Sequence, residues 1–220
     1  NMERMFHHAL NFNQPIGAWD VSSVTNMRLM FENSGFNQPL ENWDVSNVSN
    51  MERMFHISQF NQPIANWNVS SVNNMSNMFS SSNFNQPIEN WDVSNVTNMS
   101  QLFQGSPFNQ DISSWTFHPD VVFNSPQDWA FFITTQNYNS NYYDALLQSF
   151  SDQNLTNKNF RVQGLSYCNT SARNDLINNK GWTINGDAII PSSITPPGNI
   201  TIIANQGTCE AIDVELGNPV

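Results

Sequence analysis

Hydrophobic and polar positions along the first half of the chain follow one pattern that repeats every 24 residues. Each unit reads Phe-Asn-Gln-Pro, an apolar residue, two variable positions, Trp-Asp-Val-Ser, then Val, Asn-Met and Met-Phe. The opening phenylalanine recurs without insertion at Phe12, Phe36, Phe60, Phe84 and Phe108. Self-similarity at a fixed period is typical of a solenoid, in which each unit stacks on the next.

The pattern within one unit predicts two short elements. Trp-Asp-Val-Ser alternates with period 2, which predicts a strand over 19–22 with Trp and Val inward and Asp and Ser outward. From Val24 the apolar residues recur at three- and four-residue spacing, which predicts a short helix over 24–31. Asn-Gln-Pro then turns the chain back. The fold class expected is α/β, a solenoid with a parallel sheet on one face and short helices on the other.

Three residue types form columns along the expected stack. We interpret the nine methionines as packing on the helix face rather than as a metal-binding or oxidisable stripe. An exposed tryptophan column would be a sugar-stacking platform, but its phase with valine favours the core. The asparagine after each opening phenylalanine is expected to hydrogen-bond the turn backbone in a ladder. These columns are Trp19, Trp43, Trp67, Trp91 and Trp115, and Asn13, Asn37, Asn61, Asn85 and Asn109.

Charge and motif content narrow the function classes. Seven basic and eighteen acidic residues give a net charge of −11, which argues against nucleic acid or anionic lipid as a partner. No apolar stretch reaches the roughly 18 residues that insertion into a membrane needs. His7, His8, His56 and His118 are scattered in the sequence, and no nucleophile elbow, phosphate loop or zinc spacing is present. The chain is therefore predicted not to be an enzyme; catalysis would need a pocket in the segment after the repeats.

The outward face of the predicted strands is the candidate ligand-binding surface. Adjacent parallel strands lie about 4.8 Å apart, so Asp20 and Asp44 would repel by roughly 1 kcal/mol in water. A bridging Ca²⁺ would relieve this repulsion, since calcium prefers oxygen ligands; a solvated polar ladder is the alternative. The candidate ligand-binding residues are Asn42, Asp44, Ser46, Asn66, Asn68, Ser70, Asn90, Asp92 and Ser94.

The run Trp-Asp-Val-Ser-x-Val-x-Asn-Met-x-x-Met-Phe, followed by Phe-Asn-Gln-Pro-Ile, resembles the BspA-like leucine-rich-repeat surface proteins of bacteria. The resemblance covers residues 1–119; Asn68 in place of Asp and Leu102 in place of Met are mild departures. It implies a right-handed leucine-rich-repeat solenoid, a secreted or cell-surface location, and a role in adhesion or protein binding. It brings no catalytic residues.

Residues 120–190 are expected to form an α+β cap that covers the open end of the stack, as solubility requires. The apolar patterns predict three strands and two helices, the second helix being stopped by Gly181. The strands are expected at Trp129–Thr134, Asn159–Gln163 and Gly181–Ile184, and the helices at Tyr142–Phe150 and Ser171–Ile177.

The final segment, 191–220, is expected to be a linker followed by the start of a module that resembles a hyalin repeat, a partial β-sandwich. Modules of this kind carry a cysteine at the position that Pro196 occupies here. The disulfide partner of Cys209 is therefore left open. Cys168 is interpreted as a buried structural thiol rather than a reactive one. Because the chain starts within a repeat, we expect it to be a piece of a longer protein.

Two functions remain open. The first is adhesion or ligand binding at the cell surface, with a protein or glycan gripped by the concave face of the repeats. The second is a structural role, as a stalk or fibre subunit that self-associates through the open edge at Asn1. An enzyme is the third and weakest alternative.

Overall fold

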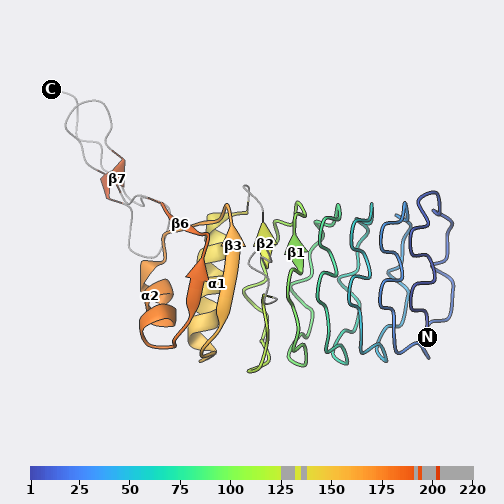
Figure 1. The fold of residues 1–220 in the computed structure, drawn as a ribbon, viewed down its shortest axis with the longest axis horizontal. Coiled ribbons are helices and arrows are strands. Elements are labelled where there is room, and N and C mark those ends of the chain that lie inside the picture. The colour runs from blue at the N-terminus through green and yellow to red at the C-terminus, as the bar shows by residue number, and fades with distance from the viewer. Residues whose placement is uncertain (125–131, 135–137, 191–192, 195–201, 204–220) are drawn as a thin grey trace.

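The computed structural model describes residues 1–124, 132–134 and 138–190, and the backbone of the two short strands at 193–194 and 202–203. The fold is mixed α/β. The 24-residue units form successive coils that lie side by side from the N-terminus, and two helices and a parallel sheet follow them (Figure 1). One hydrophobic core runs from Ile16 in the first coils to Ile184 beyond the second helix.

A backbone hydrogen-bond ladder joins neighbouring coils along residues 26–33 and their equivalents, a surface that we call the ladder face. Parallel bridges connect Asn26, Asn50, Asn74, Asn98 and Val122. Between them, alternate N–H groups of one coil donate to carbonyls of the next. In the second coil these bonds run from Met27 to Asn50 (3.0 Å), from Leu29 to Glu52 (2.9 Å), from Phe31 to Met54 (2.9 Å) and from Asn33 to His56 (2.8 Å).

The predicted helix over 24–31 is wrong. These residues form successive turns, with Met30 N bonded to Met27 O. The N–H groups of Met27, Leu29 and Phe31 bond the next coil instead of pointing back along a helix. A left-handed residue recurs every four positions and breaks any helical run. Positive φ angles occur at Leu29 (59°), Asn33 (50°), Arg53 (54°), Ile57 (53°), Asn77 (56°) and Ser81 (54°).

The predicted strand over 19–22 is also wrong, although its inward and outward positions are right. In the second coil Trp43 and Val45 are buried and Asp44 is exposed, as expected. However, tight turns shape this segment, and side chains rather than backbone groups bond it to the neighbouring coil. The Asn47 amide, for example, donates to Ser22 O at 2.8 Å. The parallel backbone hydrogen bonds therefore join residues 26–33 and their equivalents, and not the tryptophan segments where the sequence predicted them.

The core of the coils consists of stacked aromatic and methionine columns. Inside one coil, the rings of Phe79 and Phe84 stack at 3.9 Å, and Phe79 lies 5.9 Å from the rings of Phe55 and Phe103. The interpretation of the methionines as core is confirmed for seven of the nine, while Met2 is half-buried and Met5 exposed on the first coil. The fully enclosed residues are Met27, Met30, Met51, Met54, Met75, Met78 and Met99.

The tryptophan column is core, as expected, and each buried indole also binds the coil before it. Its N–H donates to the carbonyl 27 residues earlier, so that burial leaves no indole donor unpaired. Trp19, on the first coil, is 41% exposed. The bonds join Trp43 to Ile16 (3.1 Å), Trp67 to Leu40 (3.0 Å), Trp91 to Ile64 (3.1 Å) and Trp115 to Ile88 (3.0 Å).

The asparagine ladder is confirmed. The Oδ1 of each asparagine accepts from the backbone N–H of its equivalent one coil later, and from the next glutamine side chain in most coils. The acceptors run from Asn13 to Asn109, and Asn139 N continues the ladder beyond the repeats at 2.8 Å.

Asn61→Ala is expected to lower the free energy of unfolding by about 1–2 kcal/mol, because it leaves Asn85 N–H without an acceptor and leaves the Gln86 amide with only the backbone carbonyl of residue 61. Asn66→Ala, five residues on, is the matched control. Its amide is exposed, so the change should stay within about 0.5 kcal/mol. Urea denaturation of both variants measures the difference, and equal losses would contradict a structural role for the ladder.

The segment after the coils extends the ladder into a regular parallel sheet of order β1-β2-β3-β5. Strand β1 is the ladder segment of the last full coil. The two helices pack against each other, and β4 pairs with β6 in a second parallel sheet. The bounds are β1 Phe103–Gln104, β2 Ile133–Thr134, α1 Ser140–Asp152, β3 Asn159–Gln163, β4 Ser166–Tyr167, α2 Thr170–Asn178, β5 Thr183–Asn185 and β6 Ala188–Ile189.

Most elements expected in this segment are confirmed. Both helices and the strand at β3 lie where the apolar pattern placed them, and Gly181 follows α2 with φ of 69°. The last strand begins two residues later than expected. Of the strand expected at Trp129–Thr134, only β2 lies within the described residues. Trp182 repeats the coil rule, since its indole donates to Leu155 O, again 27 residues earlier, at 2.7 Å.

The interpretation of Cys168 as a buried thiol is wrong. Cys168 is half-buried and disulfide-bonded, beside the start of α2. Asp144 of α1 accepts the backbone N–H groups of Cys168 (2.9 Å) and Asn169 (2.8 Å), which ties the two helices together at this point. Cys209, the second cysteine of the sequence, lies outside the described residues.

Little of the expected linker and sandwich segment falls within the described residues. Strands β7 Ser193–Ile194 and β8 Ile202–Ile203 pair antiparallel. The first of them lies within the expected linker, and the second within the expected first strand of the module. The other residues of 191–220 lie outside the described part of the chain.

Candidate functional site

The nine candidate ligand-binding residues share one surface, which we call the polar edge: the exposed and half-buried positions of 42–46, 66–70 and 90–94. The asparagine and aspartate positions are exposed and the serines are half-buried. Behind them the tryptophans and valines are at most 3% exposed, so each polar group projects from a rigid base. The side-chain amides of Asn42, Asn66 and Asn90 make no hydrogen bond to any described residue.

Local hydrogen bonds occupy one carboxylate oxygen of each aspartate on this edge. Asp20 Oδ1 accepts from Ser22 N (3.0 Å) and Ser22 Oγ (2.6 Å), and Asp44 Oδ1 accepts from Ser46 N (3.0 Å). Hydrogen bonding to Ser46 lowers the pKa of Asp44, partly opposed by desolvation and by the charge of Asp20. No described residue donates to the second oxygen of either carboxylate. A calcium ion between Asp20 and Asp44 stays a prediction.

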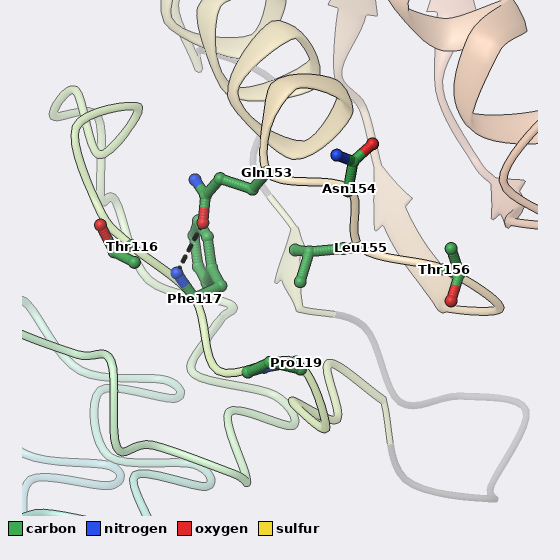
Figure 2. A pocket seen from close by; sticks show the side chains of 7 residues that line it. All are labelled: Thr116, Phe117, Pro119, Gln153, Asn154, Leu155 and Thr156. Carbon is green, nitrogen blue, oxygen red and sulfur yellow. Dashed lines mark hydrogen bonds between the residues drawn. The ribbon is translucent and has the colours of Figure 1, made fainter.

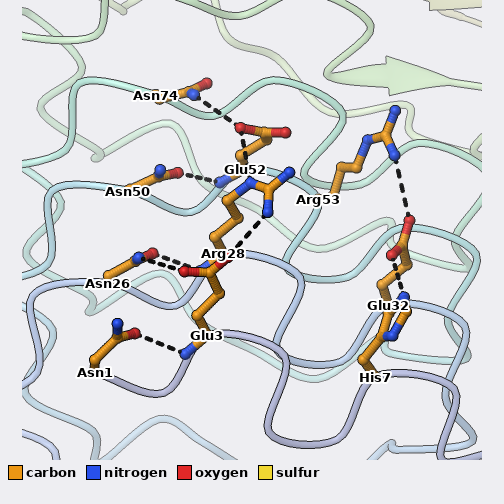
Figure 3. A network of polar contacts seen from close by, with 10 residues as sticks. All are labelled: Asn1, Glu3, His7, Asn26, Arg28, Glu32, Asn50, Glu52, Arg53 and Asn74. Carbon is orange, nitrogen blue, oxygen red and sulfur yellow. Dashed lines mark hydrogen bonds and ion pairs between the residues drawn. The ribbon is translucent and has the colours of Figure 1, made fainter.

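The ladder face carries a charged network that the sequence analysis did not identify (Figure 3). Arg28 on the second coil lies between two acids, with NH1 3.0 Å from Glu3 Oε1 on the first coil and Nε 3.3 Å from Glu52 Oε2 on the third. Asn26 and Asn74 donate to the same two acids. The three charged residues occupy one repeat position, so opposite charges alternate from coil to coil.

A second cluster on the ladder face centres on Glu32, which is only 8% exposed. Its Oε2 lies 2.8 Å from His7 Nε2, and its Oε1 lies 2.8 Å from His56 Nδ1 and 3.7 Å from Arg53 NH1. Burial alone raises the pKa of Glu32, but the His56 hydrogen bond and the charges of His56, Arg53 and His7 lower it overall. Figure 3 shows Glu32 between His7 and Arg53.

Describing the histidines as scattered was wrong for three of the four. His7, Glu32 and His56 all follow the second phenylalanine of their repeat, so stacking in register brings them into one column, and His8 lies beside them. The signal was present in the sequence: aligning the units on Met-Phe gives His, Glu, His, Ser and Gln at the next position. The helix predicted for this segment obscured that column.

A pocket of about 220 Å³ lies between the last coil and the loop after α1 (Figure 2). Gln153 reaches across it, with Oε1 accepting from Phe117 N at 2.7 Å and Nε2 donating to Trp115 O at 2.8 Å. Hydroxyl, amide and apolar groups line the pocket, and its lining includes no acid, base or thiol. The lining residues are Thr116, Phe117, Pro119, Gln153, Asn154, Leu155 and Thr156.

Neither helix in the described part of the chain has the length and apolar character that crossing a bilayer demands. The two helices, α1 and α2, are 13 and 9 residues long.

Comparison with known proteins gives a family without a function. The model of a family described as "Mycoplasma protein of unknown function, DUF285" matches the chain twice, over residues 1–83 and 34–144. The two matches overlap within the repeats and extend to the beginning of α1. No curated protein and no solved structure matches the chain.

Proposed function

Since the chain belongs to the DUF285 family, whose description assigns no function, we propose a function from its surface: ligand binding through the polar edge. The protein acts as an adhesin-like binding module at the cell surface, where it takes up a protein or glycan, and it is not an enzyme. The observation that carries this proposal is the column of three exposed amides, at Asn42, Asn66 and Asn90, that have no described hydrogen-bond partner.

The chemistry of the polar edge suits a partner rich in hydroxyl or amide groups. Each amide offers two N–H donors and a carbonyl acceptor, and the neighbouring aspartates offer a further carboxylate oxygen. The buried tryptophans behind these residues hold the column rigid, which lowers the entropic cost of binding. A net charge of −11 favours such hydrogen-bonded recognition over phosphate groups or anionic lipid.

The proposal extends to the type of repeat fold and to the cellular location of the protein. The stacked 24-residue coils support a right-handed leucine-rich-repeat solenoid over 1–119 with a cap over 120–190. The resemblance to BspA-like surface proteins supports an extracellular or cell-surface location. The disulfide at Cys168 is consistent with that location, since disulfides persist outside the reducing cytosol.

Binding of the purified chain to an array of glycans and matrix proteins tests the proposed function. For a ligand found on the array, Asn66→Ala is expected to weaken binding about fivefold, because losing one direct hydrogen bond costs about 1 kcal/mol. The triple substitution of Asn42, Asn66 and Asn90 by alanine should abolish detectable binding.

The matched control is Asn73→Ala. Asn73 lies on the same coil, and its exposed side-chain amide is likewise without a described partner, but it lies outside the polar edge. Binding should stay unchanged in this variant. Equal loss in Asn66→Ala and Asn73→Ala, or full binding by the triple variant, would place the ligand elsewhere.

The structural alternative is supported by the first coil. Leu10 is 64% exposed, Met5 48% and Trp19 41%, and a coil of the same kind, from this chain or another copy, would cover them. Ordered filaments in electron microscopy, with no ligand on the array, would favour a stalk or fibre over adhesion.

A further inference from the structure

The corner of the ladder face where the first coil meets the second carries an imidazole–carboxylate cluster that ligand binding at the polar edge does not use. Among the described residues, His7, His8 and Glu32 form the one group of three His, Cys, Asp or Glu side chains whose ligand atoms all lie within 4.8 Å of one another. A tetrahedral zinc ion with bonds of about 2.0–2.1 Å holds its ligand atoms about 3.4 Å apart. Small side-chain rotations therefore convert the cluster into a coordination site.

We propose that His7, His8 and Glu32 bind a divalent transition metal, with Zn²⁺ as the best fit. Two imidazoles and one carboxylate are typical zinc ligands, whereas calcium and magnesium prefer oxygen alone. Three protein ligands leave the fourth position to water. His8 is exposed, which gives the ion access, while Glu32 is almost enclosed.

The surroundings of Glu32 already hold it in the orientation that the ion needs. Its Oε2 faces His7 Nε2 at 2.8 Å, where the metal would replace the shared proton. Its Oε1 is occupied by His56 Nδ1 at 2.8 Å, in the manner of the outer partners that orient metal-bound carboxylates. Asn33 Nδ2 lies 3.1 Å from His8 Nδ1. With the Asn33 amide turned so that its Oδ1 accepts from Nδ1–H, Nε2 of His8 becomes the ligand atom.

One charge opposes the ion. The Arg53 guanidinium lies 3.7 Å from Glu32 Oε1, on the side away from His7, and competes for the same carboxylate. The distance is long for a hydrogen bond, and the arginine is 44% exposed, so solvent screens this repulsion. The bound metal would link residues of the first coil to Glu32 of the second, and so hold these two coils together.

Isothermal titration of ZnCl₂ into the untagged chain tests the site, with Co²⁺ as a second probe. We expect one ion per chain, visible ligand-field absorption with Co²⁺, and no competition from Ca²⁺. His8→Ala and Glu32→Gln should each weaken binding at least about tenfold, and His56→Ala about tenfold through the orientation of Glu32. His8→Ala changes an exposed side chain and leaves the fold intact.

His118→Ala is the control for adventitious binding, because His118 lies on the last coil, away from the cluster, with its Nδ1 bonded to Asp120 N. Zinc affinity should be unchanged in this variant. The proposal is overturned if the parent chain binds no zinc, if His118→Ala weakens binding as much as His8→Ala, or if His8→Ala binds zinc as tightly as the parent.

Discussion

Phe79→Ala is expected to lower the free energy of unfolding by about 3–5 kcal/mol, the range for large-to-small changes in a closed core. Phe79 is fully buried and stacks on Phe84 at 3.9 Å, with Phe55 and Phe103 on the neighbouring coils at 5.9 Å. Because the coils on both sides are fixed by the ladder, they cannot collapse into the cavity. Urea denaturation followed by tryptophan fluorescence measures the loss.

Phe6→Ala is the matched control, since Phe6 occupies the same repeat position on the first coil. Its ring stacks on Phe12 at 3.9 Å and on Phe31 at 5.4 Å, but it has a coil on one side and is half-buried. In a stack where each unit contacts only its neighbours, this change should fray the first coil and cost about 1–2 kcal/mol. Equal losses in the two variants would show that position along the stack does not matter.

The sequence predicted correctly which side chains are buried but not the backbone that buries them. Met27, Met30 and Phe31 follow helical spacing, and all three are fully buried. Two consecutive turns bury the same positions, because each turn ends at a left-handed residue and these residues recur every four positions, close to the 3.6-residue period of a helix. Hydrophobic spacing alone does not distinguish these backbones.

The left-handed positions explain why the turns escaped detection. Glycine or asparagine normally marks a positive φ, yet Leu29, Arg53, Ile57 and Gln101 adopt it here. The conformation costs about 1–2 kcal/mol per residue, and the inter-coil hydrogen bonds of the ladder compensate for it. The compensating hydrogen bonds come from neighbouring coils, about 24 residues away in the sequence, so a short stretch of sequence gives no sign of them.

The polar columns were predictable because they depend on the repeat period alone. Asn68 in place of the usual aspartate shows this, since its Oδ1 accepts from Ser70 N (3.2 Å) and Ser70 Oγ (2.7 Å) as the aspartates do. The Glu32 cluster depends on the same period but lies in the segment predicted to be helical. A helix over this segment does not bring His7, Glu32 and His56 into register, so the sequence did not predict their column.

Asp187→Ala is expected to lower the free energy of unfolding by about 3–5 kcal/mol, since it removes the buried carboxylate of an ion pair whose arginine is half-buried. The Asp187 carboxylate is 1% exposed and accepts from Arg173 Nε and NH2, both at 2.8 Å. Tyr143 OH donates to Oδ2 at 2.9 Å. The substitution leaves the half-buried Arg173 guanidinium without its carboxylate and the buried Tyr143 hydroxyl without its acceptor. Chemical denaturation provides the measurement.

Glu3→Ala, which removes a surface partner of Arg28, is the control. That pair is about one-third exposed, and such pairs contribute about 0–1 kcal/mol. If Asp187→Ala also lowers the free energy of unfolding by only about 0–1 kcal/mol, water or another acceptor replaces the carboxylate. The contrast tests burial rather than charge, because each substitution removes one acid from an arginine.

Removing all the polar partners together should restore much of the lost stability. The triple variant that combines Arg173→Met, Asp187→Leu and Tyr143→Phe has no charge or hydroxyl left to desolvate at this site. Apolar side chains of similar size fill the space instead. We expect this triple variant to be at least about 2 kcal/mol more stable than Asp187→Ala alone. If it is equally unstable, the network stabilises the segment through its hydrogen-bond geometry, and the loss in Asp187→Ala does not come from an uncompensated buried charge.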